Sequence, residues 1–522
     1  MWRGRAHRLR PLDHSLLNTN NMDDEYLQFN INPVVAQLHK HPCDFTMDDI
    51  IRFIRENDVH FINFMYPGGD GRLKTLSFVI TNMAYLKSIL TCGERVDGSS
   101  LFDFITASNS DLYVLPRFST AFLSPFAEEP TLCMLCSFFD KDGRPLESAP
   151  EWTLCKAVRT MKERAGIDFH AMGELEFYVI KPIEEAYPAR EQHGYHESSP
   201  YAKDGDFRLR CMEYIAKAGG IIKYGHSEVG NFVRDGLMYE QNEIEFLPVP
   251  ALLAADELLI AKWVIRNLGY REGCNVTFAP KITTGEAGSG LHFHIRLMKD
   301  GRSVMNENGH LSELSRKAIA GLLDVAPALT AFGNKIPTSY FRLVPHQEAP
   351  TNVCWGDRNR SALIRVPLGW SKGVDMCSEA NPKEASHLVD TSDKQTFEIR
   401  SADGSADPYQ MLAGICVGLL HGLEMPNALE MADCTYVAVN IHDKANEQKL
   451  AELKSLPDSC AASADCLEQQ RVVFEKYGIF SKAMIDGVIA QLRSFNDRSL
   501  RHDVALHPEE IAKLVRRYFH CG

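Results

Sequence analysis

Residues 172–180 read MGELEFYVI, an apolar run that contains two glutamates two positions apart, Glu174 and Glu176. The β-branched and aromatic residues predict a buried strand, and side chains two apart on a strand point to the same face. An ionised carboxylate without a partner is costly to remove from water, so this pair needs a cation, a proton or contact with solvent. An isolated Glu-x-Glu most often lies on an edge strand with one wet face. The alternative is a cation site, which requires further carboxylates or histidines elsewhere in the chain.

The composition is that of an ordinary globular protein. The chain has 522 residues, long enough for two or more domains, with 45% hydrophobic and 24% charged residues. A formal net charge of −13 at pH 7 argues against a nucleic-acid surface. We therefore expect no nucleic-acid partner, and we expect any anionic substrate to be met by a local cluster of arginines or metal. No apolar run approaches the ~18 residues of a membrane span, so we expect no membrane association.

The fourteen cysteines form no repeating framework. Cys133 and Cys136 make a lone CxxC within the apolar stretch TLCMLCSFF. A redox or zinc half-site would fit that spacing, but no second CxxC follows, so packing within a strand is favoured. We expect reduced thiols and a reducing compartment, which predicts a cytoplasmic localisation.

The chain divides into three parts. Residues 1–25 are predicted to be a disordered extension or a start-site artefact, because Met22 is an alternative start and the arginine-rich beginning only weakly resembles a transit peptide. Residues 26–145 predict a small β-rich domain. A helix capped by Thr46 is expected there, followed by a hairpin whose turn is PGGDG at residues 67–71.

Residues 146–522 predict a larger α+β domain with a helical C-terminal region, because acid-bearing strands alternate with long amphipathic helices. Its first helix is expected to be capped by Ser148 and to end at Gly166.

Further acids and histidines occupy strand-like segments of this larger domain. They are the additional ligands that a cation site at Glu174 and Glu176 requires. They are Glu228, Glu243, Glu245, His292, His294 and Glu398. Each motif alone is more often structural. Together they offer many carboxylates and few imidazoles, the ligands of a hard divalent cation, which favours Mg²⁺ or Mn²⁺ over zinc.

A loop-like stretch, SYFRLVPHQEAPTNVCWGDRNRSALIRVP at residues 339–367, carries four arginines. They are Arg342, Arg358, Arg360 and Arg365. Guanidinium groups pair with carboxylate or phosphate, so arginines beside a metal site indicate a carboxylated or phosphorylated substrate. A solvated basic loop is the alternative, but the stretch is rich in Pro, Trp and Leu and contains Glu348. Metals, arginines and a loop acid together indicate phosphoryl transfer.

Seven motifs in this order resemble the glutamine synthetases of the bacterial type I-like group. They are VDGSS, GELEF, SEVG with QNEIEF, GSGLHFH, SYFRLVPHQEAP, NRSALIRVP and FEIRSADGSADPY. The resemblance implies an α+β protein with an N-terminal β-grasp domain and a glutamine-synthetase-type catalytic domain. It also implies hexameric rings stacked into a dodecamer, with active sites between neighbouring subunits.

The resemblance also implies roles for individual residues. Glu176, Glu228 and Glu243 resemble the ligands of a metal near the substrate glutamate, and Glu174, His292 and Glu398 resemble those of a metal that bridges the ATP phosphates. Arg342 resembles the residue that binds the α-carboxylate of the substrate glutamate, and Gly288 resembles the residue whose backbone contacts its amino group. Arg360 and Arg400 resemble partners of the phosphoryl group in transit, and His294, Arg365 and Arg360 resemble nucleotide contacts. Asp97 resembles the residue that binds ammonium in a neighbour's site, and Glu348 the acid that closes over the intermediate.

The implied reaction uses ATP and two or more Mg²⁺ or Mn²⁺ ions to phosphorylate the γ-carboxylate of L-glutamate, after which ammonia displaces phosphate to give glutamine. One alternative is a γ-glutamyl-amine ligase acting on a polyamine or ethanolamine, but such relatives tend to lose the acids equivalent to Asp97 or Glu348. The other is a non-catalytic structural or regulatory relative, which should have lost metal ligands.

The chain departs from the family pattern at a few positions. Ala287 stands where Asn is frequent, Thr396 where a basic residue is frequent, and Arg296 where a small polar residue is usual. Tyr436 lies near the place of a tyrosine that some members adenylylate, although its surroundings differ. These departures affect the predicted contacts to substrate and nucleotide.

Overall fold

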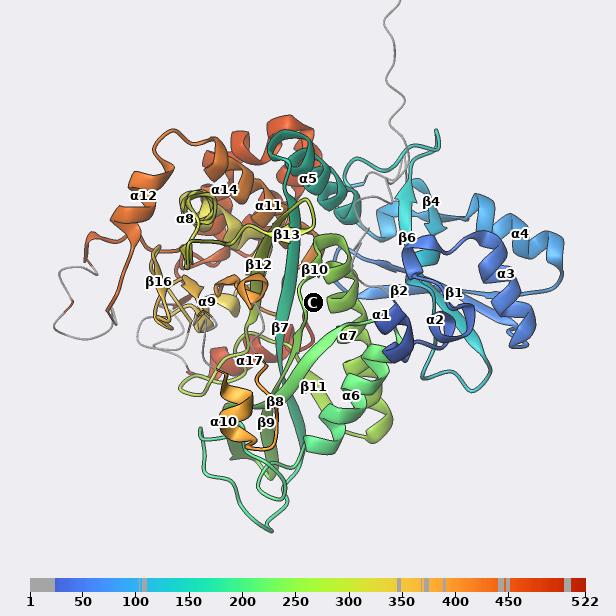
Figure 1. The fold of residues 1–522 in the computed structure, drawn as a ribbon, viewed down its shortest axis with the longest axis horizontal. Coiled ribbons are helices and arrows are strands. Elements are labelled where there is room, and N and C mark those ends of the chain that lie inside the picture. Colours follow the sequence, from blue (N-terminus) through green and yellow to red (C-terminus); the bar gives the residue numbers. More distant parts are fainter. Residues whose placement is uncertain are drawn as a thin grey trace, which may run out of the picture.

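The computed structural model describes residues 24–102, 104–105, 110–344, 349–367, 369, 375–387, 391–439, 446, 451–501 and 508–522. They form a small N-terminal domain beside a larger α+β domain (Figure 1). Nearly all of the predicted N-terminal extension, residues 1–23, lies outside the described residues, as does Glu348. The predicted α+β class is confirmed.

The N-terminal domain is built around a mixed sheet. Its elements are α1 (Asp24–Phe29), α2 (Pro33–Leu38), α3 (Met47–Glu56), β1 (Phe61–Pro67), β2 (Leu73–Val79), α4 (Met83–Cys92), β3 (Glu94–Asp97), β4 (Asp111–Pro116), β5 (Phe122–Leu123) and β6 (Thr131–Phe139). The strand order is β2-β1-β6-β4-β3, and β1 runs parallel to β6. The predicted hairpin is confirmed as β1 and β2, and Thr46 and Asp49 form a capping box on α3.

The larger domain contains the remaining elements. They are α5 (Pro150–Ala165), β7 (Asp168–Pro182), α6 (Gly205–Lys217), β8 (Ile222–Arg234), β9 (Leu237–Phe246), β10 (Val249–Pro250), α7 (Ala251–Glu272), β11 (Asn275–Thr277), β12 (Leu291–Lys299), β13 (Arg302–Ser303), β14 (Asn306–Glu307), β15 (His310–Leu311), α8 (Glu313–Gly333), α9 (Ser339–Arg342), β16 (Trp355–Asp357), β17 (Ile364–Val366), α10 (Met376–Ala380), β18 (Phe397–Ile399), α11 (Pro408–Glu424), α12 (Ala428–Thr435), α14 (Cys460–Glu475), α15 (Lys482–Ser494) and α17 (Pro508–Tyr518).

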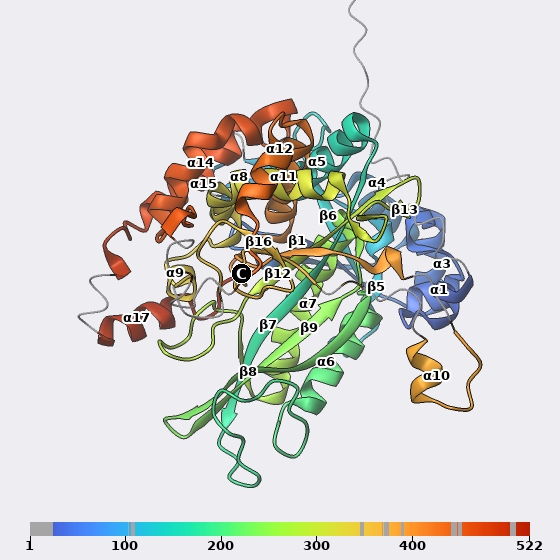
Figure 2. The same cartoon turned by 60° about the vertical axis from the view of Figure 1, so that its left-hand side comes forward.

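Strand β7 lies in the middle of the large sheet, whose order is β16-β17-β18-β12-β7-β9-β8. Figure 2 shows β7, β9 and β8 side by side. The interpretation of Glu174 and Glu176 as members of a wet edge strand is therefore wrong. Strand alternation gives β7 one face toward helix α7, where a side chain on Gly173 would collide with Leu258, and an opposite face that carries the two glutamates.

Helix α5 begins differently from the prediction. The N-cap is Ala149, which offers no side-chain cap, and Pro150 is the first helical residue. Ser148 is therefore not the cap, because proline already lacks one of the amide hydrogens that a cap would satisfy and its φ is preset for a helix. Gly166 ends the helix with φ 69°, as predicted.

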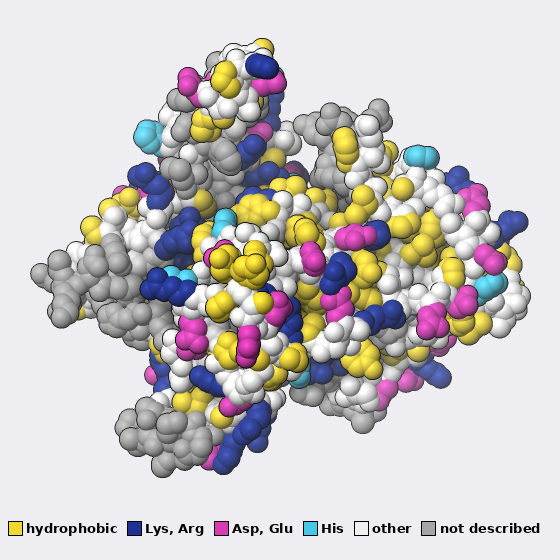
Figure 3. Space-filling model, turned by 90° about the horizontal axis from the view of Figure 1, so that it is seen from below, with side chains coloured by type: hydrophobic (Ala, Val, Ile, Leu, Met, Phe, Trp, Pro, Cys, Tyr) yellow, Lys and Arg dark blue, Asp and Glu magenta, His cyan; other side chains and the backbone are white. Residues whose placement is uncertain are grey.

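An ion pair joins the two domains. Both terminal nitrogens of Arg117 lie 2.8 Å from the carboxylate oxygens of Asp256 on α7, and Tyr409 of α11 bonds to the same carboxylate. All fourteen cysteines are free thiols, and Cys133 and Cys136 are buried in β6 as strand residues. On the face seen in Figure 3, Lys and Arg side chains are interspersed with Asp and Glu. Within the described residues, no single helix is long and apolar enough to cross a membrane.

Candidate functional site

A cleft of about 1160 Å³ opens over the sheet face that carries Glu174 and Glu176. Most residues predicted from the sequence to form a site line it together. They are Glu174, Glu176, Glu228, Glu243, Gly288, His292, His294, Arg342, Arg360, Arg365, Glu398 and Arg400. These residues come from segments more than 200 positions apart, and the antiparallel register of β7 with β9 and β12 brings them onto one face.

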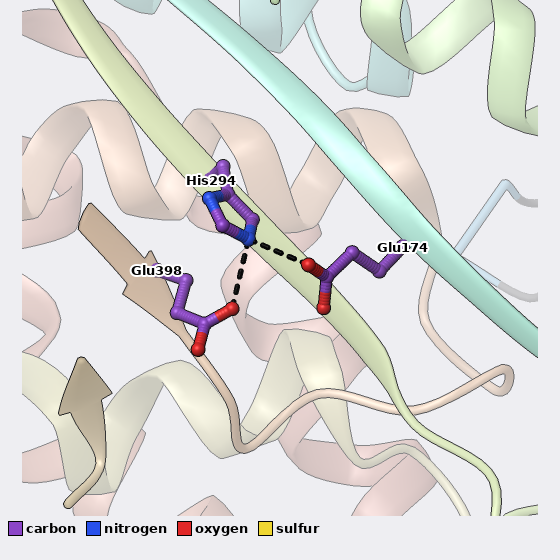
Figure 4. Close-up of side chains that lie close together, drawn as sticks. All are labelled: Glu174, His294 and Glu398. Atoms are coloured by element: carbon purple, nitrogen blue, oxygen red, sulfur yellow. Dashed lines mark hydrogen bonds and ion pairs between the residues drawn. The ribbon is translucent and has the colours of Figure 1, made fainter. Parts of the chain in front are cut away.

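The first cluster consists of Glu174, His294 and Glu398, which converge from β7, β12 and β18 (Figure 4). The Nε2 atom of His294 lies 2.7 Å from Glu174 Oε1 and 2.8 Å from Glu398 Oε2. On the other side of the ring, Nδ1 lies 2.8 Å from the hydroxyl oxygen of Thr396. Thr396, which departs from the family pattern, thus orients the histidine between the two carboxylates.

His292 lies on the same face but has different neighbours. Its Nδ1 atom is 2.9 Å from Glu174 Oε2, and its Nε2 atom is 3.2 Å from Arg342 Nη2. In this arrangement His294 lies between Glu174 and Glu398, whereas His292 contacts Glu174 and the guanidinium. The assignment of His292 to a metal and of His294 to the nucleotide remains a prediction.

The second cluster consists of His226, Glu228 and Glu243, contributed by β8 and β9. The Nε2 atom of His226 lies 3.1 Å from Glu243 Oε1. Both glutamates were predicted from the sequence as metal ligands, but His226 was not. The signal was present, since His226 and Glu228 are two apart and share a strand face.

Glu176 lies between the two clusters. Its Oε2 atom accepts hydrogen bonds from the Gly290 amide at 2.7 Å and from the side-chain amide of Gln241 at 3.0 Å. Its other oxygen lies 3.9 Å from His292 Nε2. These contacts leave Glu176 beside both clusters, with one oxygen fixed by neutral donors.

Several carboxyl groups of the cleft have shifted pKa values. Burial raises the pKa of Glu176 to about 7, and burial with the surrounding carboxylates raises that of Glu243 well above its usual range. Burial also acts to raise the pKa of Glu398, but His294 and Arg400 hold it at about 2 despite the nearby Glu174. These opposite pKa shifts indicate that His294 balances the charge of Glu398 in the first cluster. In the second cluster, Glu243 needs a proton or a cation.

The arginines border the carboxylates. Arg342 is 5% exposed, and its Nη1 atom donates to the backbone carbonyls of Ser401 and Ala402 at 2.9 and 3.2 Å. Arg365 Nη1 donates to Glu398 Oε1 at 2.8 Å, and Arg400 donates to the Arg360 carbonyl. A buried Arg342 and three arginines near Glu398 make this side of the cleft suitable for anionic groups.

Both clusters fit divalent cations by donor chemistry and spacing. Ligands at right angles around an octahedral ion, each at about 2.1 Å, lie about 3 Å apart. The nitrogen–oxygen separations of 2.7, 2.8 and 3.1 Å in the clusters are close to that spacing. Carboxylate oxygens with one imidazole in each cluster are ligands that suit Mg²⁺ or Mn²⁺.

Two predicted catalytic acids are not among the described residues that line this cleft. Asp97 ends β3 in the N-terminal domain, is exposed, and accepts hydrogen bonds from the hydroxyls of Ser99 and Ser100, both at 2.7 Å. Its action in a neighbouring subunit's site remains a prediction. Glu348 lies outside the described residues, although Arg342 before it and Ala349 after it line the cleft.

The other departures make local contacts. The carbonyl of Ala287 accepts the hydroxyl of Tyr178 at 2.8 Å, so its backbone is held at the cleft wall. Arg296 donates to the Pro248 carbonyl at 3.0 Å. Tyr436 stacks edge-on with Trp355 and donates to Asp357 at 3.2 Å.

Further lining residues received no site role in the sequence analysis. Among them are Gln192, Tyr195, Lys223, Tyr224, Lys281, Glu286 and Asn359. Glu245, which was selected only as part of a strand motif, pairs with Lys223 at 2.6 Å. Most of these residues lie on irregular segments or next to predicted ligands, where sequence periodicity gives no direction for a side chain.

Two family models match the chain. The model described as "Glutamine synthetase, beta-Grasp domain" matches residues 58–141, and "Glutamine synthetase, catalytic domain" matches residues 147–505. Among curated relatives, the glutamine synthetase of Frankia alni is 30% identical over 473 residues, covering 84% of this chain and 93% of the relative. That of Mycolicibacterium smegmatis is 28% identical over 504 residues, covering 90% and 98%.

Solved structures share the fold at lower identity. The Plasmodium falciparum glutamine synthetase structure has a TM-score of 0.72 at 21% identity, covering 89% of this chain and 99% of that one. A structure described as a GmaS/ADP complex has a TM-score of 0.68 at 19% identity, covering 85% and 95%. Because differently named proteins share this fold with similar TM-scores, the fold does not identify the substrate. The substrate has to be inferred from the residues of the site.

Proposed function

Because this chain belongs to the glutamine synthetase family, we propose that it joins ammonia to the γ-carboxylate of L-glutamate with ATP, forming glutamine, ADP and phosphate through γ-glutamyl phosphate. The observation that carries the proposal is the cleft, which is lined both by two carboxylate–imidazole clusters and by several arginines. Phosphoryl transfer needs positioned charge more than a covalent group from the protein, and this cleft supplies that charge.

The carboxylate clusters and the arginines have different roles in the first step. The two clusters would hold divalent cations, which would supply positive charge to the phosphate oxygens. Arg400 borders Glu398 and Arg360 lines the same cleft, where the two can neutralise the phosphoryl group as it moves to the substrate carboxylate. Arg365, which also borders Glu398, can contact the nucleotide phosphates. Arg342, held by backbone carbonyls at the buried end, is positioned to bind the α-carboxylate and orient glutamate.

The second step needs ammonia and exclusion of water. We assign ammonium binding to Asp97 of a neighbouring subunit, because Asp97 is exposed and is not among the residues that line its own chain's cleft. We assign Glu348 to closing the site and to taking a proton from the adduct of ammonia with the acyl group. This arrangement needs an oligomer, for which we propose stacked hexameric rings in the cytoplasm.

One observation favours a larger amine as a second candidate acceptor. Tyr195 and His196 stack at 4.2 Å, and His226 packs against both rings, at 5.4 Å and 4.4 Å, beside Glu228. Aromatic faces next to carboxylates attract alkylammonium groups as well as ammonium. The second candidate is therefore a γ-glutamyl-amine ligase of the same family.

The test measures ADP and γ-glutamyl product together, with glutamate and either ammonium, methylamine, ethanolamine or putrescine. We expect glutamine from ammonium at the highest kcat/KM. The matched control is Glu163→Gln, an exposed change outside the cleft, and the loss-of-function variant is Glu398→Gln. Preference for one of the amines would replace the ammonia assignment with the second candidate, and no glutamate-dependent ADP with any acceptor would reject both.

A further inference from the structure

His226 occupies a position at the second cluster that the sequence motifs did not reveal. We propose that its Nε2 atom is a direct ligand of the cation held by Glu228 and Glu243, which makes this a mixed nitrogen–oxygen site that prefers Mn²⁺ to Mg²⁺. This inference rests on the proposed function only in requiring that the cluster binds a divalent cation.

Hydrogen bonding fixes which nitrogen of the ring is available. The Nδ1 atom of His226 lies 3.0 Å from the backbone carbonyl oxygen of Ser227. A carbonyl can only accept a hydrogen bond, so Nδ1 carries the hydrogen, and in the neutral ring Nε2 presents its lone pair. Such a bond from the second nitrogen to a backbone carbonyl is the usual way in which a metal-binding histidine is oriented.

The free lone pair faces an acceptor. Nε2 of His226 is 3.1 Å from Oε1 of Glu243, and these atoms, together with a carboxylate oxygen of Glu228, lie within 4.8 Å of one another. Two lone pairs at 3.1 Å repel unless a proton or a cation lies between them, and the presence of Glu228 in the same cluster favours a cation. That separation matches two neighbouring ligands of an octahedral ion with bonds of about 2.2 Å.

The surrounding rings hold His226 in place. The ring of His196 packs at 4.4 Å from it and that of Tyr195 at 5.4 Å, while the His196 amide donates to the Ser227 carbonyl at 2.9 Å. The His226 side chain is only 12% exposed. A ring fixed on one side and bonded on its far nitrogen is preorganised for coordination.

An imidazole in this cluster affects which metal it selects. Mg²⁺ prefers an all-oxygen octahedron and retains water, whereas affinity for nitrogen ligands increases along the first-row transition metals. Mn²⁺ accepts both carboxylate oxygen and imidazole nitrogen. Replacing the imidazole with an oxygen ligand should therefore move the preference toward Mg²⁺.

The experiment uses the metal-stripped full chain and measures Mn²⁺ binding by EPR titration, with Mg²⁺ as competitor. We expect His226→Gln to lower the Mn²⁺/Mg²⁺ affinity ratio by ~10-fold or more, and His226→Asp to lower it while retaining Mg²⁺ binding. Glu163→Gln, an exposed change outside the cleft, is the control and should leave the ratio unchanged. Pulsed EPR of bound Mn²⁺ should lose one ¹⁴N coupling in both His226 variants.

An unchanged affinity ratio and ¹⁴N spectrum in folded His226→Gln or His226→Asp would overturn the proposal and leave the ring as a packing group. Circular dichroism and thermal unfolding establish that each variant is folded before titration. Because no step requires turnover, absence of amide synthesis would reject the proposed function without affecting this result.

Discussion

The buried carboxyl group of Glu151 predicts a pH-dependent cost to stability at the junction of the domains. Glu151 is the second residue of α5 and is 3% exposed. Its Oε1 atom accepts the Phe138 amide of β6 at 2.9 Å, and Oε2 has no hydrogen-bond partner. Burial raises its pKa from 4.5 to about 7. Glu151→Gln keeps an acceptor for the amide and removes the possibility of ionisation.

The sign follows from proton binding. Between pH 4.5 and about 7 the folded state retains a proton on Glu151 that the unfolded state has lost, so stability is fully present below pH 4.5 and falls as the pH rises through 7. At about 1.4 kcal/mol per pH unit, the loss by pH 8 is ~3 kcal/mol. The variant should therefore match the wild type near pH 5 and exceed it in stability at pH 8.

The assay is thermal unfolding of both proteins at several values between pH 5 and pH 8, in buffers of equal ionic strength. We expect the Tm advantage of Glu151→Gln to widen by a few degrees across this range. The exposed change Glu163→Gln is the control, and its Tm should depend on pH in the same way as that of the wild type. A constant Tm difference between Glu151→Gln and wild type would show that Glu151 does not titrate on folding and would refute the reasoning.

The remaining predictions concern the site. Glu176→Ala should mainly weaken metal binding on the glutamate side, whereas Glu174→Ala should mainly raise the KM for MgATP; metal titrations and kinetics that give indistinguishable defects would remove the division. Two inactive variants, Asp97→Ala and Glu398→Ala, should regain activity when co-assembled, because some interfaces then combine an intact Asp97 with an intact Glu398; inactive mixed oligomers would exclude Asp97 from a shared site. Glu348→Ala should lower glutamine formation by ~10²-fold and raise the ratio of ADP to glutamine, as water reaches the acyl phosphate; an unchanged product ratio would argue against a lid.

Most of the fold could be predicted where local chemistry and the tertiary structure agree. The capping box of Thr46 and Asp49, the β1–β2 hairpin and the left-handed Gly166 each follow from a local signal that the tertiary structure preserves. Ser148 shows the limit, since Pro150 two residues later sets the helix start instead.

The sequence predicts which residues form the candidate site, but not which of them contact one another. Alternation on a strand identifies which side chains share a face, and this was sufficient for Glu174, Glu243 and Glu398. The neighbours depend on register between strands, which places His294, rather than His292, between Glu174 and Glu398. Register is set by packing far along the chain, so a single sequence does not supply it.

The central claim is that the γ-carboxylate of glutamate is activated by phosphorylation before the amine attacks. Glutamate labelled with ¹⁸O in that carboxylate tests it directly, because displacement of phosphate from γ-glutamyl phosphate leaves one carboxylate oxygen on the phosphate. With ATP, ammonium and the wild-type protein, we predict one ¹⁸O atom in each molecule of released phosphate, measured by mass spectrometry, in a one-to-one ratio with glutamine. Glutamate-dependent release of phosphate without ¹⁸O would contradict the account.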